Sequence, residues 1–295
     1  MNTETAVKHL HAFLEDPAEA ACLEDVTPHL ARRFRDVYLP AAKSPRAPNG
    51  LSSGTVNKNV TLLKAIWVWA IDRNLTAQRY RDPWVFTQLT PRARSDEAPR
   101  REDFTAQEVS AILSAAPRGT REGDLLRLAL VTGCRVDELA MVKTQDLEDD
   151  AEGINLAEGK SRNARRYVPI PEGAWPIMSR RLVEHGESGP LFPDWPIRPS
   201  VGKVYAISQW FTRFRRQVLG GETDKRLSLH STRHTWRTVA RQARVPEGDI
   251  HDIGGWAGPR TSSTVYDHGL LKEQLAQTQE AVWSQLEAQG FLRAF

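Results

Sequence analysis

Apolar side chains recur at helical spacing through the first third of the chain. A helix is predicted to begin at Thr27 and Pro28, because threonine is a preferred N-cap and proline fits the first helical position. Pro40 is expected to end this helix. A second helix is predicted over about residues 55–72, and the first 95 residues are expected to be all-helical. The predicted buried faces comprise Leu30, Phe34, Val37 and Tyr38, then Val56, Val60, Leu63 and Trp67.

Residues 90–104 contain two prolines, many charges and almost no apolar side chain, which is typical of a linker between domains. We therefore expect two domains, residues 1–95 and residues 96–295. The Thr-x-x-Glu motif at Thr105–Glu108 is typical of a capping box, and the helix that follows is expected to bury Val109, Ile112 and Leu113.

Between residues 150 and 171 the hydrophobic period changes to alternation. This pattern predicts a β-hairpin with residues 159–165 at its tip, and with Ile154, Leu156, Tyr167, Val168 and Ile170 on its strands. Helical patterns return near residues 172–185, 207–219, 231–243, 246–253 and 270–289. The second domain is therefore predicted to be mainly α-helical with one small β-sheet.

The composition indicates a soluble cytoplasmic protein. Hydrophobic residues make up 40% of the 295 positions, which is enough for one large core or two modest ones. Cys22 and Cys134 are too few for a disulfide framework and wrongly spaced for a structural zinc site, and no apolar run could span a bilayer. The net charge is only +3, so local arginine clusters indicate either a one-sided binding surface or ordinary solvated faces.

Four polar clusters are candidates for chemistry, although each has an ordinary structural reading. Arg135 lies in Thr-Gly-Cys-Arg-Val-Asp-Glu-Leu between two apolar helices, and is either a surface residue or a guanidinium fixed by a carboxylate such as Glu138. Lys160 lies at the hairpin tip, where solvated lysines are common. Trp256 follows two glycines, and Tyr266 lies ten residues later; both could simply be core residues.

The fourth cluster, at His230–His234, opens a helix and places His230 and Arg233 on the same face of its first turn. Helix starts attract anions because free backbone N–H groups point there, so a phosphate is the expected ligand. Zinc is the competing ligand for two histidines four residues apart. However, Ser231 stands where the His-Glu-x-x-His motif needs its glutamate.

Taken in order, these clusters closely resemble the catalytic domain of the tyrosine recombinase (phage integrase) family over roughly residues 103–268. The first domain more loosely resembles the family's helical core-binding domain. The resemblance implies a C-shaped clamp around duplex DNA. It also implies a site-specific recombinase or integrase, as carried by mobile elements of bacteria or phages. No metal ion or nucleotide cofactor is implied.

The resemblance also implies a role for each matching residue. Tyr266 would attack the scissile phosphate and form a 3′-phosphotyrosyl intermediate, while Arg135 and Arg233 would bind its non-bridging oxygens with their planar guanidinium groups. His230 would assist with the phenol proton, and Lys160 would protonate the departing 5′-oxygen. In the same set, Trp256 would donate one hydrogen bond to the phosphate, and Glu138 would support Arg135.

Duplex DNA is the expected partner, and four protomers are expected to assemble on two DNA sites from a monomer or weak oligomer. Apolar residues of the last 26 positions are expected to dock on a neighbouring protomer, the alternative being that this tail folds back on its own domain. The residues expected near DNA phosphates are Lys43, Arg46, Lys58, Arg162, Arg165 and Arg166.

Two other functions stay open at this point. A type IB topoisomerase would use the same chemistry to relax supercoils, and a catalytically silent regulator would keep the fold and only bind DNA. The filled catalytic positions argue against the regulator, and the helical first domain and the long tail argue against the topoisomerase.

Overall fold

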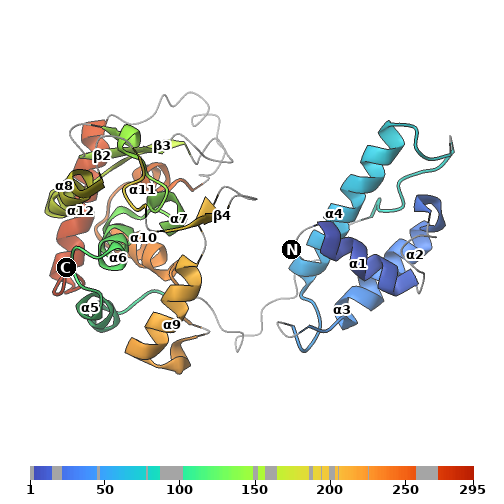
Figure 1. The fold of residues 1–295 in the computed structure, drawn as a ribbon, viewed down its shortest axis with the longest axis horizontal. Helices are drawn as coiled ribbons and strands as arrows, with labels where there is room; N and C mark the ends of the chain where they lie inside the picture. Colours follow the sequence, from blue (N-terminus) through green and yellow to red (C-terminus); the bar gives the residue numbers. More distant parts are fainter. Residues whose placement is uncertain are drawn as a thin grey trace. The chain divides into compact units, whose positions relative to one another are not determined.

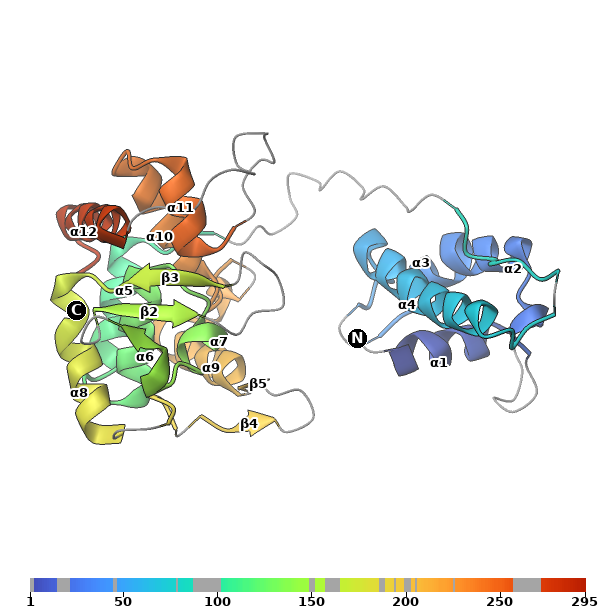
Figure 2. The same cartoon turned by 90° about the horizontal axis from the view of Figure 1, so that it is seen from above.

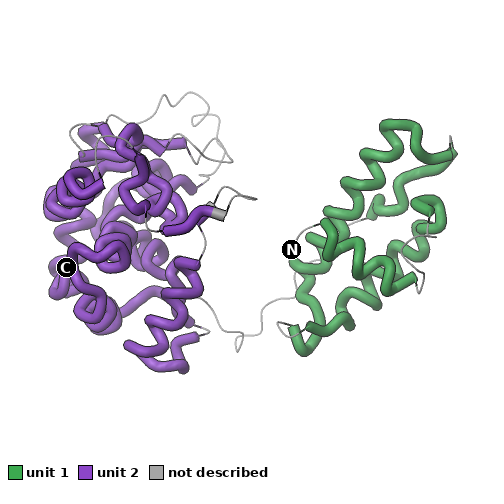
Figure 3. The backbone as a smooth tube through the Cα atoms, viewed as in Figure 1, with its two compact units in different colours: residues 1–98 green, residues 99–295 purple. Residues whose placement is uncertain are grey.

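The computed structural model describes residues 3–14, 22–44, 47–77, 79–86, 102–148, 152–156, 165–185, 189–193, 195–198, 203–204, 206–224, 226–256 and 272–295. The chain divides into two compact units, Met1–Ala98 and Pro99–Phe295 (Figure 3). No helix in these ranges is both long enough and apolar enough to cross a membrane.

The described part of the first unit is helical (Figure 1). Its buried core combines aliphatic side chains with three aromatic ones, and Trp84 makes edge-to-face contacts with Phe34 and with Trp67. Helix α1 is not among the helices that the sequence predicts. The elements are α1 (Thr3–Leu14), a 3₁₀ turn (Leu23–Asp25), α2 (Pro28–Arg33), a π-helical turn (Phe34–Tyr38), α3 (Leu39–Ala41) and α4 (Ser53–Asp72).

The helix start at Thr27 is confirmed, since the Thr27 hydroxyl accepts a hydrogen bond from the Leu30 amide. Two details of this helix were predicted wrongly. Helical structure continues through Pro40 to Ala41, and Val37 is 65% exposed instead of buried. The π-helical turn explains the exposure of Val37, because one extra residue in a turn rotates the following side chains away from the expected face.

The second unit is mainly helical with small β-sheets, as the fold class predicted (Figure 1). Its first sheet has the order β1-β2-β3 and is antiparallel throughout. The elements are α5 (Ala106–Ala115), α6 (Arg121–Thr132), α7 (Val136–Leu139), β1 (Leu147–Glu148), β2 (Gly153–Leu156), β3 (Arg166–Pro169), α8 (Trp175–His185), β4 (Ile197–Arg198), β5 (Lys203–Val204), α9 (Ile207–Leu219), α10 (Ser231–Gln242), α11 (Glu247–Gly254) and α12 (Lys272–Ala288).

Several local predictions for this unit are confirmed. The capping box is present: the Glu108 amide donates to the Thr105 hydroxyl, and the Thr105 amide donates to the Glu108 carboxylate. The hairpin is also present, with Ile154 opposite Val168. The expectation of one sheet was wrong, because β4 and β5 form a second one; strands of two residues are too short to show alternation.

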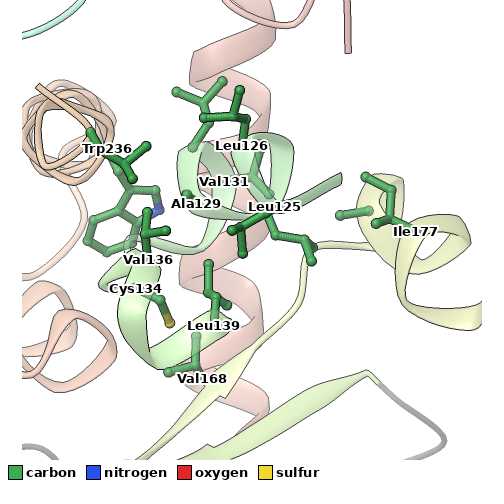
Figure 4. Packing of buried hydrophobic residues seen from close by; sticks show 14 of the residues in the cluster. Leu125, Leu126, Ala129, Val131, Cys134, Val136, Leu139, Val168, Ile177 and Trp236 are labelled. Atoms are coloured by element: carbon green, nitrogen blue, oxygen red, sulfur yellow. The ribbon is translucent and has the colours of Figure 1, made fainter. Parts of the chain in front are cut away.

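Helix α6 lies at the centre of the second unit, and ten of its twelve residues are buried. Figure 4 shows its apolar side chains between Trp236 of α10 and Ile177 of α8, with Val168 of β3 close by. Strand β3 packs against α11 and α12 (Figure 2). The core therefore joins the α6–α7 turn, the hairpin and the C-terminal helices.

The prediction that the tail docks on a neighbouring protomer is corrected. Helix α12 packs on its own unit and buries Leu275, Val282 and Leu286. The buried Gln279 accepts a hydrogen bond from the Trp236 indole and donates one to the carbonyl of Pro169. The alternative reading, in which the tail folds back in cis, is the observed one.

Candidate functional site

The turn between α6 and α7 positions Arg135. Helix α6 ends at Gly133, whose φ of +66° favours glycine, and a Cβ atom there would lie 2.5 Å from the Trp236 ring. Arg135 is then the N-cap of α7. The Glu138 carboxylate accepts hydrogen bonds from the Arg135 amide at 3.0 Å and from Arg135 Nη1 at 2.6 Å. The Arg135 side chain is 43% exposed, so it is held in place but accessible.

Glu138 is also bonded by a second arginine. Arg166 Nη2 donates to Glu138 Oε2 at 2.8 Å, and the Arg166 side chain is only 6% exposed. Burial alone would raise the pKa of Glu138, but hydrogen bonds from Arg166 and Arg135 outweigh it and hold that pKa below its ordinary value. Glu138 is therefore a carboxylate anion shared by two arginines.

Arg233 is a buried guanidinium with unused hydrogen-bonding capacity. It lies in the first turn of α10, 1% exposed, and its Nη1 donates to the carbonyl of Gly133 at 2.6 Å. Its Nε and Nη2 have no hydrogen-bond partner among the described residues. Burial and the positive charges of Arg135 and Arg166 lower the pKa of Arg233 to about 10. Such a group is costly unless an anion is bound beside it.

Trp256 covers Arg233. The Arg233 guanidinium lies 3.8 Å from the centroid of the Trp256 ring, within the range of a cation–π interaction, and the Trp236 ring stacks on Trp256 at 6.3 Å. Gly254 makes this arrangement possible, because a Cβ atom on Gly254 would lie 1.9 Å from Trp256. In this structure Trp256 acts as a platform for the arginine.

His230 lies at the N-terminus of α10, as the N-cap residue, and is exposed. Its ring contacts the His234 ring edge to face at 4.9 Å. Partial desolvation lowers the pKa of His230, and the positive charges of His234, Arg233 and Arg135 lower it further. The imidazole is therefore favoured in its neutral form, which can accept a proton.

The structure brings together Arg135, Glu138, His230, Arg233 and Trp256. These residues come from segments up to 121 positions apart, and the three helices whose ends carry them, α7, α10 and α11, meet around Gly133 and Trp236. The predicted site residues Lys160 and Tyr266 lie outside the described residues, as do Arg46 and Arg162. Within the described ranges, no cluster of three or more His, Cys, Asp or Glu side chains could hold a metal ion.

The predicted DNA contacts separate into two groups. Lys43, Lys58 and Arg165 are exposed, as a phosphate contact requires. The Arg166 side chain is only 6% exposed and is bonded to Glu138, so it is not presented to solvent as the other three are. The alternation of the strand could have revealed this, since Arg166 is two residues before the buried Val168 and therefore shares its inward face.

The donors of the site have the chemistry that a small anion requires. Arg233 has two nitrogen donors without a partner among the described residues, Arg135 adds an accessible guanidinium, and His230 lies at the start of the helix that carries Arg233. Guanidinium groups of this kind match the oxygens of a tetrahedral phosphate.

Comparison with known proteins identifies the fold. The sequence model of the phage integrase family matches residues 102–272, which is more than half of the chain. The chain belongs to the phage integrase family, the tyrosine recombinases. It is 24% identical over 272 residues to the tyrosine recombinase XerC of Mycobacterium bovis (strain BCG / Pasteur 1173P2), covering 89% of this chain and 85% of that protein.

Two solved integrases have a similar fold. The Tn1549 transposon integrase, in complex with transposon right end DNA, matches with a TM-score of 0.57 and 17% identity over 98% of this chain and 93% of that one. A lambda integrase tetramer bound to a Holliday junction matches with a TM-score of 0.58 and 15% identity over 87% and 70% of the two chains. At these identities the likeness concerns the fold.

Proposed function

We propose that this recombinase cleaves and rejoins duplex DNA at specific sites through a 3′-phosphotyrosyl intermediate on Tyr266. The observation that carries the proposal is the buried Arg233 guanidinium, with two N–H donors that have no partner among the described residues. A scissile phosphate placed there would satisfy both donors. Family membership and the DNA-bound integrases of similar fold support DNA as the source of that phosphate.

The proposed chemistry is a transesterification. The Tyr266 oxygen attacks the phosphorus, the bond to the 5′-oxygen breaks, and Lys160 gives that oxygen a proton while His230 assists with the proton of the phenol. Arg135 and Arg233 stabilise the negative charge that gathers on the non-bridging oxygens. Attack by a free 5′-hydroxyl on the phosphotyrosine reverses the steps. Because one phosphoester replaces another, the cycle needs no cofactor to supply energy.

Trp256 has a different part in this proposal from the one that the sequence predicts. Its ring holds the Arg233 guanidinium at 3.8 Å and that of Arg237 at 4.7 Å. We propose that Trp256 orients Arg233 toward the phosphate and shields it from water. A hydrogen bond from its indole to the phosphate would add to this role.

We further propose that duplex DNA contacts both units, residues 1–98 through Lys43 and Lys58 and the second unit through Arg165. Lambda integrase forms a tetramer on a Holliday junction, and we propose four protomers on two DNA sites for this chain as well. The buried face of α12 is already occupied within its own unit. We therefore propose that the contacts between protomers use other surfaces.

The test uses nicked duplexes prepared from the DNA that flanks the gene, designed so that cleavage releases a short strand and traps the protein. The wild type should form a covalent complex that survives denaturing electrophoresis. Tyr266→Phe should form none while its DNA affinity stays nearly unchanged, since only the nucleophilic oxygen is removed. A covalent complex with Tyr266→Phe would exclude Tyr266 as the nucleophile.

The same duplexes and variants, with a plasmid assay, distinguish a recombinase from a silent regulator and from a topoisomerase. A silent DNA-binding regulator would bind the duplexes and give no covalent complex with any variant. A topoisomerase would relax a supercoiled plasmid that lacks the flanking sequence. We expect relaxation of plasmids only when they carry the site.

A further inference from the structure

Arg166 lies where three segments of the second unit meet. It is the first residue of β3, and its side chain is 6% exposed. Its Nη2 donates to Glu138 Oε2 at 2.8 Å and lies 3.9 Å from Cys134 Sγ, while its Nε donates to the carbonyl of Ile253 at 2.7 Å. One guanidinium therefore connects the turn before α7, α7 itself and the last turn of α11.

Two of these contacts lead directly to the site. Glu138 holds the Arg135 guanidinium at 2.6 Å. Ile253 is three residues before Trp256, whose ring carries the guanidinium of Arg233 at 3.8 Å. Arg166 therefore bonds directly to Glu138, which holds Arg135. It also bonds to Ile253, close in sequence to Trp256, which holds Arg233.

Arg166 also changes the electrostatics of the site. A lone carboxylate 2.6 Å from Arg135 would cancel much of the guanidinium's attraction for an anion. Arg166 binds the same carboxylate, with Nη2 at 2.8 Å from Oε2 and Nη1 at 3.4 Å from Oε1. The group of two arginines and one glutamate keeps a net positive charge, and Arg135 is both anchored and attractive to phosphate.

We propose that Arg166 is a positioning residue for strand cleavage. It fixes Glu138 and bonds the end of α11 to the same place. Its charge also keeps the group of Arg135, Glu138 and Arg166 positive, so that the group attracts the scissile phosphate. Arg166 itself touches no reacting atom in this scheme. The role rests on the proposed function, since it concerns the rate of the cleavage step.

The experiment compares rates of covalent-complex formation on the nicked duplexes, in the full-length protein at saturating concentration and at a temperature where every variant is folded. Arg166→Met should slow this step at least roughly 10-fold, because small misplacements of a transition-state contact have effects of this size or larger. Half-site affinity should change by less than about 3-fold. Arg166→Lys keeps the positive charge but loses the planar guanidinium, so its cleavage rate should lie between those of the wild type and of Arg166→Met.

Arg181→Met is the matched control. Arg181 is equally buried, 3% exposed, and forms an ion pair at 2.9 Å with the buried Asp124. Its loss should lower the melting temperature, as the loss of Arg166 should, without slowing cleavage by folded protein. Should Arg166→Met not fold, Arg166→Lys and Arg181→Lys provide the same comparison with milder changes.

A double variant separates positioning from plain structural support. In Arg166→Met, Glu138 is paired with Arg135 alone, so its negative charge cancels the positive charge of Arg135. Adding Glu138→Gln removes that negative charge, so the double variant should cleave faster than Arg166→Met alone. If Arg166 had only a structural role, the double variant should cleave no faster than Arg166→Met, because a second substitution in one buried cluster does not restore activity.

Two results would overturn the role of Arg166 while leaving the proposed function intact. One is Arg166→Met cleaving as fast as Arg181→Met, and the other is a double variant no faster than Arg166→Met. A wild-type protein that forms no covalent complex on any flanking duplex would instead refute the proposed function, and the role of Arg166 with it.

Discussion

Replacing a buried residue of α12 tests whether the tail belongs to its own unit. Leu286 is fully buried, and Trp283 of the same helix packs so closely on the turn before α8 that a Cβ atom on Gly173 would lie 2.1 Å from it. Truncating a buried leucine to alanine costs about 2–5 kcal/mol. For a unit of this size, each kcal/mol corresponds to roughly 2–4 °C, so Leu286→Ala should melt roughly 4–20 °C lower.

The assay is calorimetric unfolding of the full-length protein at low concentration. Glu287→Ala, an exposed neighbour on the same helix, should stay within about 0.5 kcal/mol of the wild type. Deleting residues 272–295 removes several such buried side chains, a loss on the order of 10 kcal/mol, which is comparable with the whole stability of a domain. The second unit should then lose its cooperative transition. A truncated protein that keeps this transition and loses only cooperative half-site filling would refute the packing in cis.

Three other predictions follow from the site. Arg135→Lys and Arg233→Lys should each slow covalent-complex formation on the order of 10²-fold or more, because an ammonium lacks the guanidinium fork; near-wild-type rates would place the phosphate elsewhere. Arg165→Ala should lower the salt dependence of DNA binding by about one unit, and an unchanged slope in binding titrations would remove Arg165 from the interface. The pKa of His230 in the folded protein lies below its ordinary value of 6.5, so the unfolded chain binds a proton there at higher pH than the folded protein does. The stability of the folded protein should therefore decrease as the pH falls through 6.5. In melting curves recorded against pH, His230→Gln should reduce this decrease.

Much of the fold could be predicted because its signals are local. The capping box at Thr105 needs only two residues three positions apart, and the hairpin needs only alternation on each side of a turn. The order of the charged clusters then indicated the family, as the match over residues 102–272 confirms. What the pattern of Leu30 to Tyr38 could not show is the π-helical turn, since its extra residue leaves no mark on apolar spacing.

The surface on which the C-terminal tail packs could not be predicted, because it depends on contacts with residues far away in the sequence. An apolar stripe on a helix shows that one face is covered, and the covering surface can belong to the same chain or to another. Gln279 decides between them, through hydrogen bonds to Trp236 and to the carbonyl of Pro169, which are 43 and 110 positions away. A glutamine within an apolar stripe is a weak sequence signal, although it marks a place where a buried polar group needs fixed partners.

Arg166 and Arg233 differ in whether their hydrogen bonds are satisfied within the protein. Arg166 has its hydrogen bonds filled by Glu138 and Ile253, so its burial is compensated within the protein. Arg233 is equally inaccessible, yet two of its donors have no described partner, a deficit of about 1–3 kcal/mol for each unsatisfied group. In the proposed function, a bound phosphate removes this deficit. Pairing with a phosphate would recover that free energy as the charge of the transition state grows, and Arg233 can therefore contribute to catalysis in a way that the satisfied Arg166 cannot.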